Sequence, residues 1–261
     1  MRFSLSTAAA LLLAAADQAT AQRSPRAAST NGKGPFVVDN QYKFTGRLYW
    51  DFSSGRMADW LRASEYKVWP THEFQRSNVA VSGGYLQLKV PGGQKNRPIK
   101  GGEVVTTVNN IKYASVRTVA VFTENPGVCN GIFFYKSDKQ ETDIEWLSDP
   151  ASQSNAGNRQ VWFANQDNNG DRRKTWKSAQ PPANPTSTEH EYRLDWIPGM
   201  TRFFIDGVQK WNTTKDVPSV SGPWVWNNWA DGDKGWSVGP PVKDAVFKIK
   251  EIDIYYNTAP A

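Results

Sequence analysis

Short runs of alternating apolar and polar residues, separated by turn-forming dipeptides, recur through most of the 261-residue chain. A period of two places every second side chain on the same face, which is typical of a β-strand with one buried side. Such strands are expected at residues 47–52, 79–81, 85–90, 103–107, 116–123, 131–136, 141–147, 160–165, 192–197, 201–205 and 245–256. Many strands at close spacing with almost no helix indicate an all-β domain.

The turns between these runs predict how the strands connect. Ser82-Gly83-Gly84 and Asp206-Gly207 are hairpin signals, and Pro198-Gly199 suits a tight reversal. Hairpins join antiparallel neighbours, so we expect a two-sheet antiparallel β-sandwich. The one helical expectation is residues 54–64, where Ser54 is placed to cap a short amphipathic turn.

The ends of the chain differ in composition from its middle. Residues 1–21 combine Arg2, an apolar Ala/Leu run and small residues at Ala19 and Ala21, which is the pattern of a cleaved export signal. The apolar run is too short to cross a bilayer, so we expect a secreted, extracellular protein that is not bound to a membrane. Residues 22–40 are expected to form a disordered leader. Residues 41–258 are expected to form a single domain.

Charge and cysteine content exclude several classes of partner. The formal net charge is +6, but the basic residues are scattered and the longest run, Arg172-Arg173-Lys174, is short. We therefore expect no nucleic-acid partner, and we expect a monomer. The lone cysteine, Cys129, has no second cysteine with which to form an intrachain disulfide, and we expect it to be a buried apolar residue.

Three acidic residues alternate along one predicted strand. Side chains at positions i, i+2 and i+4 share a face, so Glu141, Asp143 and Glu145 point one way and Trp146 points the other. Neighbouring carboxylates repel one another and raise the pKa of at least one member. Glycoside hydrolysis needs two carboxyl groups, one to attack the anomeric carbon or activate water and one to protonate the leaving oxygen. From spacing alone, a solvent-facing acidic strand or a calcium site stay open as alternatives.

The Glu-x-Asp-x-Glu pattern resembles the signature of glycoside hydrolase family 16, whose members share a concanavalin A-like β-jelly roll. The similarity extends in family order from about Leu48 to Tyr256 and includes Asn227-Asn228-Trp229. It implies that Glu141 is the nucleophile, Asp143 assists it, and Glu145 is the general acid/base of a retaining double displacement. The five-residue form is similar to the branch of lichenases, xyloglucan-active enzymes and wall transglycosylases.

Substrate contacts follow from the same resemblance and from the many tryptophans. We expect them at Glu103, Phe134, Trp162, Asn165, Asn227, Trp229 and Trp236. Four tryptophans, Trp224, Trp226, Trp229 and Trp236, lie among Gly, Pro, Asn and Asp, where loops are expected. Exposed indole rings stack well on the flat faces of sugars, and Trp229 and Trp236 are favoured as such platforms.

No metal or cofactor is expected. His72 is placed in a polar loop and His190 at the start of a strand, and neither has a second ligand at metal-binding spacing. A structural calcium ion stays open as an alternative, although the sequence does not indicate one. Asn212 begins a glycosylation sequon just after the Asp206-Gly207 turn, where surface exposure is expected.

The sequence therefore predicts a secreted, endo-acting β-glycanase that cleaves a cell-wall-type polysaccharide, with β-glucan as the preferred candidate. Two departures from lichenases place the substrate preference in doubt: Val105 stands where they carry a cleft Arg, and Gln140 where they usually carry Asp. A wall-glucan transglycosylase with the same carboxylates is the first alternative. A non-catalytic glycan-binding lectin is the second.

Overall fold

Two large β-sheets make up most of the residues that the computed structural model describes, which are 23–26, 34–168, 170 and 173–260. The eight-stranded sheet has the order β17 (Val208–Thr213), β16 (Met200–Ile205), β15 (His190–Ile197), β10 (Ile111–Val121), β19 (Ala245–Thr258), β8 (Tyr85–Val90), β7 (Val79–Ser82), with β3 (Gly46–Asp51) also paired to β19. The nine-stranded sheet has the order β14 (Thr175–Ala179), β13 (Val161–Asn165), β12 (Gln140–Leu147), β11 (Cys129–Ser137), β18 (Trp224–Trp229), β9 (Ile99–Thr106), β6 (His72–Phe74), β5 (Tyr66–Val68), with β4 (Leu61–Ala63) also paired to β9.

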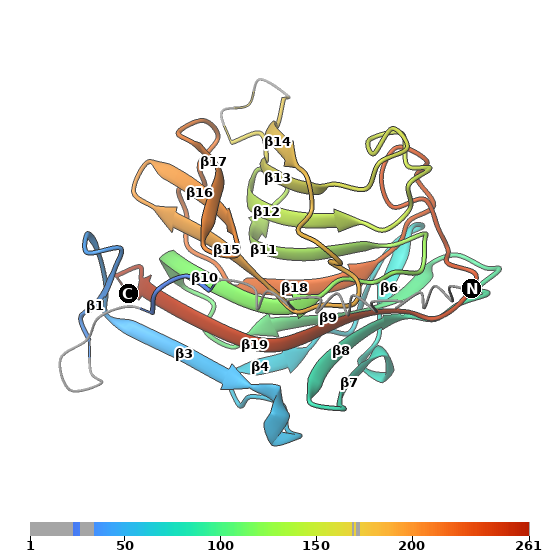
Figure 1. The fold of residues 1–261 in the computed structure, drawn as a ribbon, viewed down its shortest axis with the longest axis horizontal. Coiled ribbons are helices and arrows are strands. Elements are labelled where there is room, and N and C mark those ends of the chain that lie inside the picture. The colour runs from blue at the N-terminus through green and yellow to red at the C-terminus, as the bar shows by residue number, and fades with distance from the viewer. Residues whose placement is uncertain (1–22, 27–33, 169, 171–172, 261) are drawn as a thin grey trace, which may run out of the picture.

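The pairing confirms the predicted antiparallel sandwich. Among the described strands, β6 and β9 are the one parallel pair. Figure 1 shows β3 (blue) beside β19 (red), so that segments from opposite ends of the chain are neighbours in the eight-stranded sheet.

Aromatic side chains from both sheets fill the space between them. Phe122 stacks on Trp146 of the nine-stranded sheet, with ring centroids 5.3 Å apart, and contacts Tyr192 of the eight-stranded sheet at 4.3 Å. On β12 the inward residues include Ile144 and Trp146, which are fully buried. Since alternate residues point to opposite faces, burying these side chains turns the acidic residues of β12 away from the core.

The predicted hairpin turns have the expected backbone. Gly83 and Gly84 have φ values of 60° and 81° between β7 and β8. Asp206 and Gly207 have φ values of 49° and 74° in the turn between β16 and β17. Two successive residues with positive φ are the mark of the type I′ turn, whose twist matches that of the strands it joins.

The helix predicted at residues 54–64 is wrong. A single 3₁₀ turn, η1 (Phe52–Ser54), begins after Asp51, whose side chain accepts a hydrogen bond from the Ser53 amide. Gly55 ends that turn in the left-handed region at φ 72°. The chain then runs irregularly to β4, which pairs with β9. The apolar residues that suggested a helix face pack against the core from an irregular segment and a short strand.

The segment predicted as a disordered leader, residues 22–40, has ordered structure at both described ends. A hairpin of β1 (Phe36–Val38) and β2 (Tyr42–Phe44) packs Phe36 and Phe44 against Ile197 and Tyr255. Composition missed this hairpin because three apolar residues in a row are enough to cover a small patch of an existing sheet.

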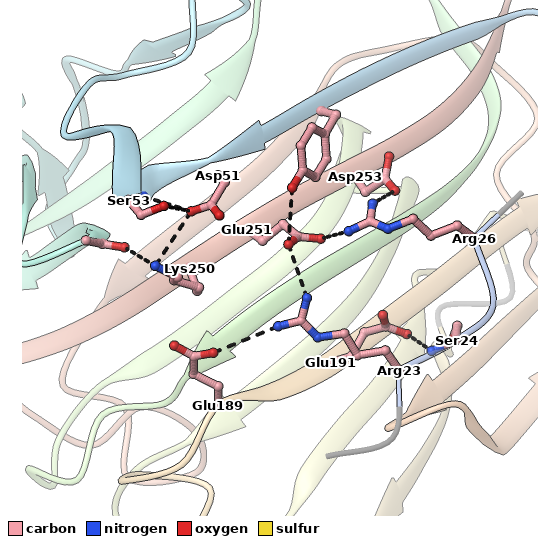
Figure 2. A network of polar contacts seen from close by, with 12 residues as sticks. Arg23, Ser24, Arg26, Asp51, Ser53, Glu189, Glu191, Lys250, Glu251 and Asp253 are labelled. Atoms are coloured by element: carbon pink, nitrogen blue, oxygen red, sulfur yellow. Dashed lines mark hydrogen bonds and ion pairs between the residues drawn. The ribbon is translucent and has the colours of Figure 1, made fainter. Parts of the chain in front are cut away.

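Residues 23–26 also lie on the eight-stranded sheet, held by charged groups (Figure 2). The amide of Ser24 donates to Glu191 Oε1 at 2.8 Å, and Arg26 pairs with Glu251 and Asp253 of β19. These acidic partners are more than 160 residues away in sequence, so no local pattern predicts the contact.

The predicted export signal at residues 1–21 lies outside the described residues and stays a prediction. Across the described part of the chain, no helix is long and apolar enough to span a membrane.

Candidate active site

Strand β12 places the three predicted catalytic carboxylates on one wall of an open groove. Glu141, Asp143 and Glu145, here called the acidic trio, all line this groove, which has a volume of about 930 Å³. The face of the nine-stranded sheet that carries them is called the cleft face. The intervening Thr142 and Ile144 point into the core and are fully buried. The predicted alternation along this strand is therefore confirmed.

Burial dominates the electrostatics of the acidic trio. It raises the pKa of Glu141 to about 7, with the negative charge of Glu145 adding to the effect. It also raises the pKa of Asp143 well above its usual value, helped by the charges of its two neighbours. Asp143 and Glu141 are hydrogen-bonded to each other, which requires a proton on one of them. Asp143 as the proton donor stabilises the carboxylate of Glu141, the form that can attack carbon.

Glu145 is held by two neutral donors. Cys129 Sγ lies 3.1 Å and Trp236 Nε1 lies 3.3 Å from Glu145 Oε1. Burial raises the pKa of Glu145, while the hydrogen bond from Cys129 opposes the rise. A carboxyl group with a raised pKa holds its proton to a higher pH than usual and can give it up to a leaving group.

The middle member, Asp143, has one further partner. Gln166, which directly follows β13, donates from Nε2 to Asp143 Oδ2 at 3.0 Å. Among the described residues, none forms an ion pair with the acidic trio. The carboxyl groups are therefore oriented by neutral hydrogen bonds, and the charge of Lys174 opposes the rise in pKa of Glu141 and Glu145 without a direct ion pair.

A row of polar residues crosses the cleft face beside the acidic trio. In register across four strands stand Glu103, Asn227, Gly131 and Glu145. Gly131 is required here because a Cβ atom at this position would lie 2.5 Å from Asn227 Oδ1. That Oδ1 is buried and accepts no hydrogen bond from a described residue.

Glu103 is a second site of perturbed ionisation in the groove. Burial raises its pKa to about 7, while hydrogen bonds from Ser64, Asn227 and Tyr66 oppose the rise. The Tyr66 hydroxyl lies 3.3 Å from Glu103 Oε2. Perturbed carboxyl groups that share one groove are typical of a functional site.

Comparison with known proteins identifies the family. The family model "Glycosyl hydrolases family 16" matches residues 67–224. The chain belongs to glycosyl hydrolase family 16. As a member it is an enzyme that hydrolyses O-glycosyl compounds.

Relatives of this family 16 enzyme have both similar sequences and similar folds. A β-glucanase of Paenibacillus polymyxa is 24% identical over 199 residues, which cover 71% of this chain and 77% of that protein. The structure of a Bacillus licheniformis β-glucanase matches with a TM-score of 0.66 at 18% identity, covering 82% of this chain and 99% of the other. An endo-β-1,3-glucanase of Pyrococcus furiosus matches with a TM-score of 0.66 at 12% identity, covering 90% and 100%.

Three of the seven predicted substrate contacts of the family 16 enzyme line the groove. These are Glu103, Asn227 and Trp229. Trp162 and Trp236 lie on the cleft face beyond Glu145, in a cluster with Cys129, but they do not line the groove.

Phe134 and Asn165 point away from the groove, and their prediction as substrate contacts is wrong. Phe134 is 0% exposed and packs in the core against Trp196, whereas the adjacent Phe133 lines the groove. Asn165 is fully buried and donates to Thr201 Oγ1 at 2.9 Å. Both errors are errors of strand parity, since a shift by one residue exchanges the two faces.

Two tryptophans predicted in loops belong to the core. Trp224 and Trp226 are fully buried on β18, while the outward residues of that strand are Val225, Asn227 and Trp229. Flanking Gly, Pro and Asn residues therefore misled the prediction, because they bound a strand whose inward face carries Trp224 and Trp226.

His72 also differs from its prediction as a loop residue. It lies on β6, lines the groove, and its ring centroid is 5.1 Å from that of Trp229. Tyr66, Phe133 and Tyr135 line the groove as well and were not predicted. The alternation of Gly131, Phe133 and Tyr135 on β11 is the signal that could have found two of them.

The remaining predictions concern metals and exposed positions. Within the described residues, no group of three His, Cys, Asp or Glu side chains is arranged to hold a metal ion. Val105 lines the groove where lichenases carry Arg, so the groove has an apolar side chain at that point. Asn212 is exposed on β17, and its glycosylation stays a prediction.

Proposed function

We propose that this enzyme is an endo-acting β-glycanase that hydrolyses internal bonds of a β-glucan by a retaining double displacement. Glu141 is the nucleophile, Asp143 assists it, and Glu145 is the general acid/base. The observation that carries the proposal is the acidic trio itself. Its members have raised pKa values because of burial, yet they line a groove, and no described residue forms a direct ion pair with them; the charge of Lys174 only partly opposes the rise at Glu141 and Glu145.

The first half of the reaction forms a glycosyl-enzyme ester. The Glu141 carboxylate attacks the anomeric carbon, the bond to the leaving oxygen breaks, and Glu145 transfers its proton to that oxygen. Asp143 keeps its proton and donates it in the hydrogen bond to Glu141. This hydrogen bond weakens as Glu141 loses its negative charge on forming the ester.

The second half of the reaction restores the enzyme. Glu145, now a carboxylate, takes a proton from water, and the oxygen of this water attacks the anomeric carbon. The bond to Glu141 breaks, and two displacements give net retention at that carbon.

The substrate proposal rests on the shape of the groove and on the relatives. Endo-cleavage requires a site that admits the middle of a polymer chain, and the groove of about 930 Å³ has room for several sugar units. The groove walls combine Trp229 and Tyr66 with the polar row at Glu103 and Asn227, and such walls suit a glycan with apolar faces and polar edges. The curated relatives are named β-glucanase and xylanase/β-glucanase.

We further propose that the enzyme is exported, acts outside the cell as a monomer, and needs no cofactor. The support for export is the signal-like sequence at residues 1–21. The only partner in this proposal is the polysaccharide.

The test of catalysis is the Glu141→Gln variant on a panel of barley β-glucan, laminarin, xyloglucan and xylan. Release of reducing ends should fall to background on every glycan that the wild type cleaves, because an amide cannot form the glycosyl ester. The matched control is Glu65→Gln, at an exposed acid of the groove rim, which should keep activity. Unchanged release by Glu141→Gln would refute the assignment of the nucleophile.

The stereochemical test is separate. Proton NMR of the earliest product should show the β-anomer before it equilibrates, since retention keeps the configuration of the substrate. An initial α-anomer would overturn the double displacement. Product chains longer than the starting oligosaccharide would favour the transglycosylase alternative.

A further inference from the structure

A chain of three indole rings leads from Glu145 to the edge of the cleft face. Trp236 donates to Glu145 at 3.3 Å, and its ring centroid lies 5.4 Å from that of Trp162. Trp162 in turn lies 5.3 Å from Trp176 on the edge strand β14. The first two rings are largely covered, but Trp176 is 54% exposed.

Strand register places Trp176 on the same face as the acidic trio. Asp143 stands opposite Ala164 of β13, and Ala164 stands opposite Trp176 of β14. Residues paired in this way point to the same side of a sheet. Two strand spacings separate Trp176 from Asp143, which is about 10 Å, or roughly the length of two sugar units.

The groove described above lies on the other side of the acidic trio. Its lining residues come from β12 and from strands toward β5, and no described residue of β13 or β14 is among them. The cleft face therefore has two arms that meet at the trio: a hollow arm toward β5, and a flat aromatic arm toward β14.

We propose that Trp176 is the platform for the part of the glycan on the leaving-group side, which is also the acceptor side when another sugar replaces water. This inference rests on the proposed function. The general acid must lie beside the leaving oxygen, and the aromatic arm begins at Glu145 through Trp236. The hollow arm then holds the part of the chain that becomes attached to Glu141.

The chemistry of the aromatic arm suits a neutral β-glucan chain. An exposed indole face offers dispersion contact to the C–H face of a pyranose, and Trp162 fixes the angle of the ring from below. Lys174 Nζ lies 4.3 Å from the centroid of the Trp236 ring. Its ammonium group gives the aromatic arm a hydrogen-bond donor for sugar hydroxyls.

The experiment compares two substrates that share the same part on the hollow arm. One is a β-linked gluco-oligosaccharide with several units on the leaving side, and the other is the β-glycosyl fluoride of the same glycone, whose leaving group has no sugar. Trp176→Ala should lower kcat/KM about tenfold for the oligosaccharide, mainly through KM, and leave the fluoride unchanged. Trp176→Phe should retain most of the activity on the oligosaccharide.

The fluoride reaction also serves as a test of folding, because a misfolded variant would lose it. The matched control is Trp69→Ala, at an indole that is 76% exposed in the turn between β5 and β6 at the opposite edge. Trp69→Ala should leave the ratio of kcat/KM for the oligosaccharide to kcat/KM for the fluoride unchanged.

Two results would overturn the role of Trp176. An equal loss on both substrates would place the ring in glycone binding or in folding, and no loss on either would remove it from the site. Failure of the proposed function is distinguishable, since the wild type would then release neither fluoride nor reducing ends.

Discussion

Two faces of this enzyme carry buried acidic side chains, but only one of them neutralises the charge. On the cleft face, Asp143 is buried and Glu141 and Glu145 are half-buried. The outward face of the eight-stranded sheet, which points away from the core, carries Asp195, Glu191, Glu251 and Asp253, all at most 8% exposed. The two faces show how a sheet can use the same kind of side chain for chemistry and for structure.

Arginine makes the difference on the outward face. Asp195 accepts from Arg193 at 2.7 Å and from Arg202 at 2.6 Å, and Asp253 accepts from Arg47 at 2.8 Å. Figure 2 shows Arg26 reaching Asp253 and Glu251 from residues 23–26. An arginine cannot lose its proton in a protein, so each of these acidic side chains faces a permanent positive charge.

The acidic trio has no such arginine partner among the described residues, and its pKa values rise. On the cleft face, burial raises the pKa of Glu141 to about 7. Near the outward face, partial burial acts in the same direction on Asp39, but hydrogen bonds and the charges of Arg193 and Arg202 hold its pKa below the usual value. The acids of the cleft face therefore have raised pKa values, which suit proton transfer, but they form no ion pair with a described residue that would stabilise the fold. The acids of the outward face stabilise the fold through their arginine partners.

The sharpest activity test of this contrast is Glu145→Gln. The amide cannot protonate a leaving oxygen, so kcat/KM on a β-glucan should fall by about 10²–10⁴-fold. The free energy of unfolding should not fall, because a buried carboxyl with a raised pKa is replaced by a neutral group. Urea denaturation at neutral pH measures it, and a large loss of stability would show that Glu145 has a structural role as well.

A matched pair of buried aspartates gives the largest stability test. Asp195→Asn should lower the free energy of unfolding by about 3 kcal/mol, because Arg193 and Arg202 then keep Asp39 as their one anionic partner among the described residues. Asp143→Asn should leave stability unchanged or raise it, although the two aspartates are 0% and 2% exposed. Equal losses in urea denaturation would contradict the distinction between the two faces.

The sequence could predict those features of the fold and site that depend on neighbouring residues within one strand or turn. The acidic trio follows from alternation within β12, and the turn at Asp206-Gly207 follows from two adjacent residues. The face on which Phe134 lies was mispredicted. Strand β11 has apolar residues on both faces, so its sequence does not alternate between apolar and polar residues and does not indicate which face is buried. The arginine contacts of residues 23–26 join segments more than 200 residues apart, which no local pattern records.

A smaller effect should appear in the pH dependence of stability. The pKa of Glu103 is about 7 in the folded enzyme, against an ordinary value of 4.5. Its contribution to stability is therefore fully present below about pH 4.5 and is lost as the pH rises to about 7. Asp39 acts in the opposite direction, because its lowered pKa stabilises the fold above its ordinary value.

The Glu103→Gln variant removes the titrating group. Across the same pH interval it should lose less stability than the wild type, by up to about 3 kcal/mol. Denaturation midpoints over a pH series measure the difference, and Glu65→Gln at the exposed rim is the control. Parallel curves for the wild type and Glu103→Gln would show that Glu103 titrates normally.

The smallest expected effect tests the neutral donors that take the place of arginine on the cleft face. The Cys129 thiol lowers the pKa of Glu145 through one hydrogen bond, where an arginine would keep that carboxyl ionised and unable to act as an acid. Cys129→Ala removes the donor, so Glu145 should stay protonated to higher pH. The alkaline limb of the kcat/KM profile should move upward by about half to one pH unit, which is the range of one neutral hydrogen bond. Cys129→Ser keeps a donor and should keep the limb near its wild-type position. A downward movement in Cys129→Ala would mean that the thiol excludes water from Glu145 more than it donates to it, and the contrast between neutral and charged partners would then fail at the residue where it matters most.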